Sequence, residues 1–457
     1  MPEVSHGGRS LFAAAVALLL FAGVAAAQSV FPPKLDLEAA VAKALESDPQ
    51  IRASKTAEQI ADARTREART GRLPTVQFSQ SFTRSNNPVF VFGSLLEQGR
   101  FAATNFDLNA LNHPDGLNNF RSAVSIRAPI FDGWQTRTRV DRAKIGVTRA
   151  GLETEAVSQK LRFDVIRSFY GAILADELLK ATNASVRSAK ENSRNTKNFV
   201  DVGMVAESDS LVANVELANV EQQQLEAESA IVTTRAALNI SMGERPATGF
   251  ELVGDLQERY FPIEETGELV RIALGQRPDY RQAILTVEDS KKATRSARDQ
   301  KLPRLDAFGN YGYSTSGVNR GSSDYTVGLS LSYMLFEPGR KERVEESTLA
   351  ESAAVAAKDR LENQITLEVI TADQNYRTAR AKIQVSAKSV IQAEEALRIL
   401  QDRYHNAIST FEAVLRSEAA LLRAKHELLK AKYDYYISYA SVLLATGRLT
   451  DVRTFDH

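Results

Sequence analysis

The chain has 457 residues, and its 57 acidic side chains balance 57 basic ones, so no broad basic field indicates a nucleic-acid partner. It contains no cysteine, which excludes disulfides, thiol nucleophiles, cysteine-ligated zinc and iron–sulfur clusters. Only 7% of the residues are aromatic and 13 are proline, a composition typical of long helices rather than of a compact α/β enzyme.

The N-terminus has the features of a secretory signal peptide. Arg9 precedes an apolar run over 11–24, and three alanines follow before Gln28. The run is shorter than the ~20 apolar residues of a membrane-spanning helix. We therefore expect residues 1–27 to be a cleaved signal peptide rather than an anchor. Because the chain lacks cysteine, we expect no lipid on the mature N-terminus.

The rest of the chain contains two copies of one unit. Residues 41–74 match 270–303 at a constant spacing of 229 residues, whereas 131–133 match 336–339 at a spacing of 205. The first copy therefore has extra residues between these landmarks. We predict a first repeat over 28–245, a linker over 246–264, a second repeat over 265–449 and a C-terminal tail over 450–457.

Each repeat begins with a helical segment, over 35–72 and 265–301, in which apolar residues have helical spacing. Pro74 and Pro303 end these segments. Strict alternation of apolar and polar residues follows, which predicts one β-hairpin in each repeat, over about 75–131 and about 304–336. One face of the last strand consists of large apolar side chains, namely Tyr325, Val327, Leu329, Leu331 and Tyr333.

Long proline-free stretches follow each hairpin, and they predict long helices over 137–243 and 339–447. Between Leu415 and Leu443 the apolar positions step by four and three residues, which is the seam of a coiled coil. A helix over 137–200 would be ~95 Å long at ~1.5 Å per residue.

Four strands with one apolar and one polar face, on an exported chain, favour lipid on one side and water on the other. A bilayer does not tolerate unpaired sheet edges, and the smallest membrane barrels have about eight strands. Several chains must therefore combine their hairpins. Two chains would give a barrel filled by side chains, and three would give twelve strands around a lumen. The soluble alternative is a β-sandwich packed against helices.

The doubled order of helix, hairpin and long helices resembles the TolC-like outer membrane efflux protein family, the outer membrane factors of Gram-negative bacteria. The resemblance rests on this order, on the Leu-Pro after each first helix, on 131–133, and on Gly203-Met204-Val205 leading into Asp209. It implies a mixed α and β membrane protein. Three protomers of four strands each would form a 12-stranded β-barrel in the outer membrane, continued by a long α-helical coiled-coil tunnel in the periplasm.

The same resemblance implies the function. The family forms the exit duct of tripartite efflux pumps and type I secretion systems, a passive conduit for drugs, metals or polypeptides. It implies a homotrimer in the outer membrane lipid, opened by a periplasmic adaptor (membrane fusion) protein and an inner-membrane pump.

The resemblance places the segments around 203 and 407 at the periplasmic tip, where the long helices reverse direction. Ser208 and Asp209 match one position of the acidic rings that close this tip in the family, and Tyr404 resembles a tyrosine that holds it shut. The second copy departs from the pattern, because Arg416 stands where relatives have a carboxylate and is a candidate to neutralise Asp209. The alternatives are that Asp209 only stabilises a helix N-terminus and that Tyr404 is a packed helix aromatic.

Trp134, the only tryptophan, directly follows the second strand. Indole side chains favour the membrane–water boundary, so we expect Trp134 to be an anchor at the periplasmic rim, with Phe131 and Phe336 at equivalent places. Ordinary packing is the alternative for Trp134. The long connection over about 84–120 could cap the outer mouth, face phage and antibodies, or fold inward as a plug.

A rival interpretation from another class is a soluble periplasmic coiled-coil scaffold or adaptor, which would have no reason to keep one face of a strand apolar. We find no nucleophile with its base, no phosphate-binding loop and no cluster of metal ligands. We therefore predict no enzyme activity, no cofactor and no metal site.

Overall fold

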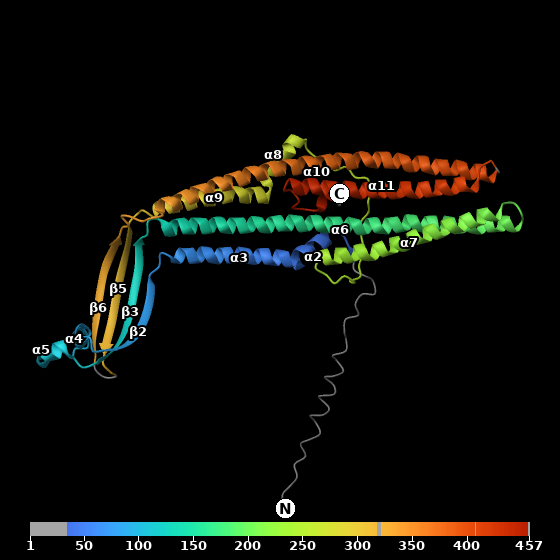
Figure 1. The fold of residues 1–457 in the computed structure, drawn as a ribbon. Helices are drawn as coiled ribbons and strands as arrows, with labels where there is room; N and C mark the ends of the chain where they lie inside the picture. Colours follow the sequence, from blue (N-terminus) through green and yellow to red (C-terminus); the bar gives the residue numbers. More distant parts are fainter. Residues whose placement is uncertain (1–33, 318–320, 407, 456–457) are drawn as a thin grey trace, which may run out of the picture.

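The computed structural model describes residues 34–317, 321–406 and 408–455. Within these residues the protomer is elongated, with a four-stranded sheet at one end of a long helical body (Figure 1). None of the described helices combines the length and the apolar character that crossing a membrane requires. The predicted signal peptide and Ala407 lie outside the described residues.

The two segments predicted as single helices are each divided in two. The first consists of α2 (Leu37–Ser47) and α3 (Pro49–Thr70), and the second of α8 (Thr266–Gln276) and α9 (Pro278–Asp299). The prediction of one helix in each segment was wrong because a proline disfavours the helical conformation of the residue before it, here Asp48 and Arg277. Asp48 has extended backbone angles, and its carboxylate accepts hydrogen bonds from Gln50 N and Ile51 N at the start of α3.

The sheet contains β2 (Thr75–Ser85), β3 (Leu117–Phe131), β5 (Arg304–Thr315) and β6 (Gly321–Ser332), all antiparallel, in the order β2-β3-β5-β6. The two hairpins are joined through β3 and β5, which leaves β2 and β6 at the edges. A separate two-residue parallel pair joins β1 (Lys34–Leu35) to β4 (Glu251–Leu252) in the helical body.

The connection between β2 and β3 contains α4 (Pro88–Glu97), the 3₁₀ helix η1 (Ala103–Phe106) and α5 (Leu108–Asn112). Asn87 starts α4, because its side-chain oxygen accepts hydrogen bonds from Val89 N and Phe90 N. We call residues 86–116 the insert. It accounts for the extra residues of the first copy.

Four long helices form the rest of the body: α6 (Gln135–Asp201), α7 (Glu207–Ser241), α10 (Arg340–His405) and α11 (Phe411–Ala445). The 67 residues of α6 extend about 100 Å. Helix α6 packs on α7, α10 on α11, and α11 on α6, so the helices lie in the order α7-α6-α11-α10. Helices α7 and α10 are therefore the edges of this layer, as β2 and β6 are the edges of the sheet.

Corresponding helices of the two halves have nearly the same length. The lengths are 11 residues for α2 and α8, 22 for α3 and α9, and 35 for α7 and α11, while α6 has 67 and α10 has 66. The insert has no helical counterpart between β5 and β6 among the described residues.

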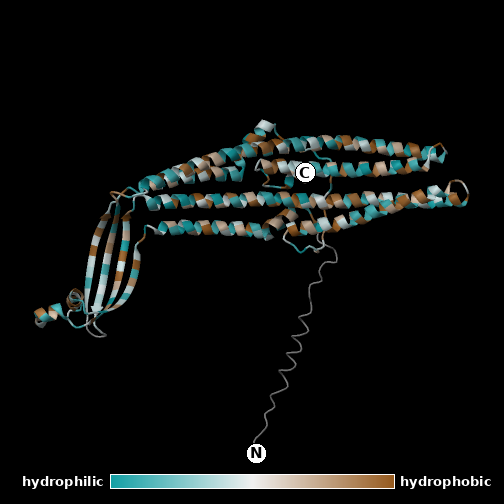
Figure 2. Cartoon of the chain, viewed as in Figure 1, coloured by the Kyte–Doolittle hydropathy of each residue, from teal (hydrophilic) through white to brown (hydrophobic). Residues whose placement is uncertain are grey.

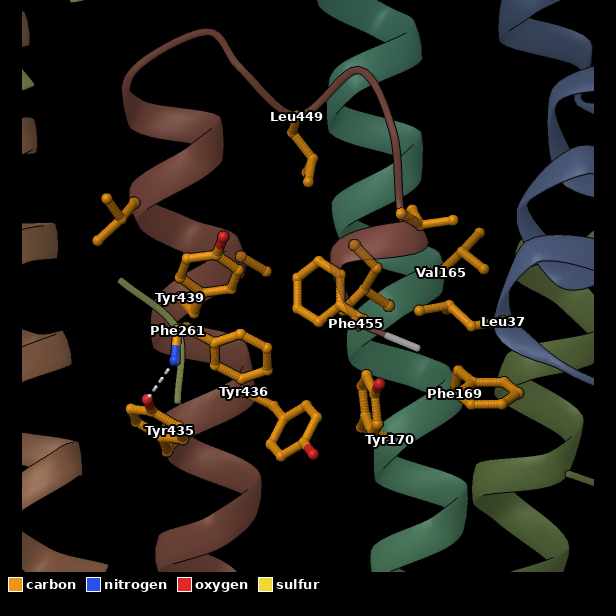
Figure 3. Close-up of a cluster of buried hydrophobic side chains, with 14 of the residues drawn as sticks. Leu37, Val165, Phe169, Tyr170, Phe261, Tyr435, Tyr436, Tyr439, Leu449 and Phe455 are labelled. Atoms are coloured by element: carbon orange, nitrogen blue, oxygen red, sulfur yellow. Dashed lines mark hydrogen bonds between the residues drawn. The ribbon is translucent and has the colours of Figure 1, made fainter. Parts of the chain in front are cut away.

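The largest buried cluster lies in the middle of the helical body, where aromatic side chains of α6 and α11 meet the linker and the C-terminal tail (Figure 3). Phe261 of the linker stacks on Tyr439, with ring centroids 4.4 Å apart, and its backbone N donates to the Tyr435 hydroxyl over 3.1 Å. Tyr376 donates its hydroxyl to the Phe261 carbonyl. Phe455 is 1% exposed, so the described part of the tail is packed into this core.

Candidate functional site

The four-stranded sheet has one apolar and one polar face, because side chains alternate along each strand and paired residues point to the same side. The apolar face carries Val76, Phe78, Val124, Ile126, Tyr311, Tyr325, Val327 and Leu329, and all of these side chains are more than a third exposed. The opposite face is mainly polar, with Phe308 as a large apolar exception, and carries Gln77, Ser79, Arg121, Ser125, Arg127, Asn310, Asp324 and Thr326. Figure 2 shows the alternation along the strands. An exposed apolar face of this extent needs a covering medium.

Aromatic residues lie at both ends of the apolar face. Phe82 and Phe120, with ring centroids 4.6 Å apart, lie near the end farthest from the helices, and Tyr313 lies one row further in. Phe131 lies at the helical end, paired with Leu305. From Leu305 to Tyr313 the strand rises about 26 Å at ~3.3 Å per residue. This is close to the ~25 Å apolar band, bounded by aromatic girdles, of membrane barrels.

The junction between β3 and α6 holds Trp134 in an unusual backbone conformation. Its φ is +66°, in the left-handed region that bulky residues rarely adopt, and it follows Gly133 with φ +64°. The indole is 46% exposed, packs edge-on against Phe131 at 5.5 Å, and has the Arg137 guanidinium 5.6 Å from its centroid. The turn therefore presents the only tryptophan at the helical end of the apolar face.

Phe336 occupies the corresponding junction between β6 and α10. It is 81% exposed, and Met334 and Leu335 beside it are also exposed. The two junctions thus form one rim of exposed apolar side chains. Their role as membrane anchors stays a prediction.

A network of polar contacts crosses the polar face. Arg121 Nη2 of β3 donates to Asp324 Oδ1 of β6 over 2.9 Å, although β5 lies between the two strands. Arg121 Nη1 donates to Ser314 Oγ of β5 over 2.9 Å and contacts Glu97 Oε2 of α4 at 3.3 Å. The insert is therefore attached to the polar face and not to the apolar one.

Two tight turns form the far end of the molecule. Between α6 and α7, Gly203 has φ +73°, and Met204 N donates to the Phe199 carbonyl over 2.8 Å. Between α10 and α11, Ile408 N donates to the Arg403 carbonyl over 2.8 Å, and Thr410 caps α11. The structure thus has the helix reversals at the positions predicted from the resemblance.

Tyr404 and Asp209 come together at this end, from opposite hairpins. The Tyr404 ring is half-buried and packs against Phe411 at 5.5 Å, beside Ala213 of α7 and Leu415 of α11. Burial raises the pKa of the Tyr404 hydroxyl, and the nearby Asp209 carboxylate raises it further. Asp209 also lies in the first turn of α7, with Ser208 exposed beside it. Both Asp209 alternatives, the helix terminus and the gate, agree with this placement.

Arg416 does not pair with Asp209 in this protomer. It forms an i, i+4 pair with Glu412 at 2.5 Å, and both side chains are mostly exposed. An exposed pair of this kind contributes ~0.3–0.5 kcal/mol. Within the protomer Arg416 is therefore paired with Glu412, and its gate role stays a prediction.

Sequence reasoning missed the polar contacts between α6 and α11. Ser188 Oγ and Asn192 Nδ2 of α6 donate to the Glu418 carboxylate of α11 over 2.9 and 2.8 Å. Nearer the middle of the body, His426 Nε2 of α11 lies 3.3 Å from Thr182 Oγ1 of α6. The only signal in the sequence was that His426 interrupts the apolar seam of α11.

The coiled-coil seam is buried in one hairpin and exposed in the other. In α11, Leu415 and Leu422 are buried. Their counterparts 204 residues earlier belong to α7, where the exposed seam residues are Leu211, Val215, Leu225 and Val232. On the other edge, α10 exposes Leu367, Val385 and Ile391. Both outer helices therefore carry apolar side chains that no described part of the protomer covers.

The fold combines a small two-faced antiparallel sheet with long helical hairpins, and solved structures share it. The crystal structure of the Campylobacter jejuni CmeC outer membrane channel matches with a TM-score of 0.76 and 19% identity, covering 92% of this chain and 88% of that one. The family model described as Outer membrane efflux protein matches residues 40–244 and 269–448, most of the chain. The chain belongs to this outer membrane efflux protein family.

Two relatives illustrate the range of the family. Outer membrane protein TolC of Vibrio cholerae is 22% identical over 331 residues, which cover 69% of this chain and 74% of the relative. Alkaline protease secretion protein AprF of Pseudomonas aeruginosa is 24% identical over 422 residues, covering 89% and 83%.

Proposed function

We propose that this protein is the channel-forming exit duct of a tripartite efflux pump or type I secretion system in the outer membrane. Three copies form a 12-stranded barrel continued by a periplasmic tunnel of helices. The duct is a passive conduit for small molecules or polypeptides. A periplasmic adaptor and an inner-membrane pump open it. Family membership and the geometry of the open edges support this proposal.

The main observation is that, among the described residues, the sheet and the layer of four long helices both end in edges without a partner. The sheet ends in β2 and β6, and the helical layer ends in α7 and α10. All neighbouring strands are antiparallel, so β6 of one copy can pair with β2 of the next without breaking the alternation. Closure into a ring pairs the free strand edges and covers the exposed apolar stripes of α7 and α10 in one step.

The two faces of the sheet then have distinct environments. The exposed apolar face with its aromatic ends contacts lipid, and the polar face lines a water-filled lumen. The junctions with Trp134, Phe131 and Phe336 lie at the periplasmic membrane surface. The far tips of the helices lie in the periplasm.

The tip is the gate of this duct. Three Asp209 carboxylates brought to ~6 Å of one another would repel by roughly 3 kcal/mol per pair at an effective dielectric of ~20. Such a ring attracts cations or a basic partner. Tyr404 packs between the two hairpins and resists their separation, so the partner proteins must disrupt its contact to open the tip.

The experiment is a matched pair of arginine substitutions on neighbouring residues of β6. Val327→Arg puts a charge on the apolar face, and Thr326→Arg puts the same charge on the polar face. A charge at mid-membrane costs ~2–4 kcal/mol on the lipid side of a barrel. We expect Val327→Arg to lose trimers from the outer membrane fraction. Thr326→Arg should assemble and conduct with a weaker preference for cations in planar bilayers.

The subunit number of the detergent-solubilised protein, measured by light scattering, completes the test. Three copies with a conducting pore support the duct. A stable monomer recovered from the soluble periplasmic fraction without detergent, with both arginine variants equally tolerated, would instead favour a coiled-coil scaffold.

A further inference from the structure

The insert between β2 and β3 lies at the end of the sheet farthest from the long helices, where Figure 1 labels its helices α4 and α5. Its anchor residues in the strands are Asn119 and Arg121 of β3, Ser314 of β5 and Ser322 of β6. They lie within a few residues of the outer strand ends, Ser85, Leu117, Thr315 and Gly321. In a membrane barrel this end is the outer mouth.

One face of α4 is buried against the sheet. Val91, Ser94 and Gln98 follow one another at spacings of three and four residues, so they share one side of the helix, and all three are buried. Gln98 is 2% exposed, and its Nε2 donates to the Asn118 carbonyl and to Asn119 Oδ1, both over 2.9 Å. A buried amide that is paired in this way is costly to release.

Charge adds to this attachment. Glu97 Oε2 lies 3.3 Å from Arg121 Nη1 and accepts a hydrogen bond from Ser314 Oγ over 3.3 Å. Gly99 has φ +65°, a left-handed conformation that glycine adopts without strain, and it lies beside β6, where an added Cβ would be in ordinary contact with Ser322 Cβ at 3.5 Å. Arg121, Ser314 and Asn119 all belong to the polar face.

From this placement we propose that the insert is an outer constriction of the duct, folded onto the lumen side of the barrel mouth, and that it sets the size of solute that the mouth passes. The inference rests on the proposed function, because it takes the polar face as the lumen wall. The insert is neither a lipid-side element nor a loop directed away from the mouth. Glu97 and Gln98 hold the insert against the strands, and we call these two residues the latch. When they release the strands, the mouth widens.

The chain contains no cysteine, so a single introduced thiol reports access to the lumen. Ser125 lies on the polar face of β3, four residues further inside than Arg121. Intact cells that express Ser125→Cys are treated from outside with a small charged methanethiosulfonate or with a maleimide on a kilodalton-sized polyethylene glycol. The background variant Glu97→Ala/Gln98→Ala releases the latch without changing the strands. Asn109→Ala, an exposed side chain of the insert, is the control.

We expect the small reagent to label Ser125→Cys in every background. The large reagent should react slowly in the parent and in Asn109→Ala, and about ten-fold faster or more with the latch removed, which is the effect of losing one charge-assisted hydrogen-bonded group. Trimers on unheated gels verify assembly. The milder Glu97→Gln should also raise the rate at which the large reagent labels Ser125→Cys.

Two outcomes would contradict different parts of the proposal. If the large reagent labels the parent as fast as the latch variant while the small one also reacts, the insert does not narrow the mouth and the duct stands. If the small reagent fails in all backgrounds, the polar face is not a water-filled lumen, and the proposed function and the constriction fall together.

Discussion

Arg121 and Asp324 form a hydrogen bond that passes over Gly312 of the intervening strand. The Arg121 Nη2 to Asp324 Oδ1 distance is 2.9 Å. A Cβ on Gly312 would lie 2.7 Å from Arg121 Nη2 and 2.9 Å from Asp324 Oδ2. The pair therefore joins β3 to β6 only because the residue between them has no side chain. It ties three strands together at the level where the insert is attached.

Gly312→Ala should accordingly destabilise the assembled barrel. The added methyl group displaces the Arg121–Asp324 pair, and loss of a partly exposed ion pair of this kind costs about 0.2–1 kcal/mol. Gly309→Ala is the matched control on the same strand, because its nearest neighbours would lie at 3.7 and 4.0 Å, ordinary contact distances. The temperature at which trimers dissociate on gels measures the difference. Equal dissociation temperatures for the two variants would show that the pair moves aside freely.

At the tip, Asp209→Asn should change the gate and leave the fold intact. It removes the charge and keeps the size of the side chain, so we expect a weaker cation preference or a higher single-channel conductance in planar bilayers. Ser208→Ala, at the neighbouring gate candidate, measures separately what the exposed hydroxyl group contributes to both properties. A current–voltage curve of Asp209→Asn identical to the parent would restrict Asp209 to a favourable interaction with the N-terminus of α7.

Substitutions of Tyr404 separate the contribution of ring packing from that of the hydroxyl group at the same tip. Tyr404→Ala loses the contacts with Phe411 and Ala213, and an aromatic pair contributes about 0.5–1.5 kcal/mol beyond its buried area. Tyr404→Phe keeps them. We expect conductance to rise in Tyr404→Ala and to stay near the parent in Tyr404→Phe. A rise in both would indicate that the hydroxyl group, rather than the ring, holds the gate.

The burial of His426 predicts how the free energy of unfolding depends on pH. Burial lowers the pKa of its imidazole in the folded state, and Glu427 opposes this shift. The unfolded chain therefore takes up the proton more readily, with a pKa of about 6.5. The contribution of neutral His426 to the free energy of unfolding is fully present above that pKa. It declines as the pH falls through the unfolded pKa towards the lower pKa of the folded state.

The melting temperature of the purified protein should thus fall as the pH is lowered from about 7 to about 5, and His426→Gln should flatten this dependence. Glutamine can still hydrogen-bond to Thr182. His405→Gln, an exposed histidine near the tip, is the control and should keep the parent's pH profile. The same profile in all three proteins would assign the pH dependence to other groups.

Patterns of period and spacing predicted much of the fold. Alternation in 325–333 predicted β6 and its apolar face, because each residue of a strand lies on a fixed side. The four-and-three spacing after Leu415 predicted α11 for the same kind of reason. The boundary within 35–72 was missed, although Pro49 was visible, because helical spacing of apolar residues continues on both sides of the break.

The contacts of the candidate site depend on relations between distant segments, which periodicity does not encode. Glu97 and Arg121 are 24 residues apart, and nothing in either local pattern indicates that α4 folds onto the polar face. Arg416 shows the same limit. The resemblance suggested Asp209 as its partner, whereas within the protomer it pairs with Glu412, four residues away on the same helix, and its role at the gate stays a prediction.

Trp134 provides a direct test of the membrane boundary, because it is the only tryptophan and therefore the only indole fluorophore. Its exposed ring lies at the helical end of the apolar face. In proteoliposomes, lipids brominated along the acyl chain should quench its emission strongly, with most quenching from bromines nearest the headgroup.

Two tryptophan transfers in a Trp134→Phe background calibrate that measurement. Phe336→Trp moves the fluorophore to the equivalent junction and should be quenched to a similar extent. Tyr404→Trp moves it to the far tip, about 100 Å away along α6, and should be insensitive to brominated lipid. If Phe336→Trp is quenched and Trp134 is not, the indole packs at the strand–helix junction without contacting the bilayer. The left-handed turn that holds Trp134 would then serve the entry into α6 alone.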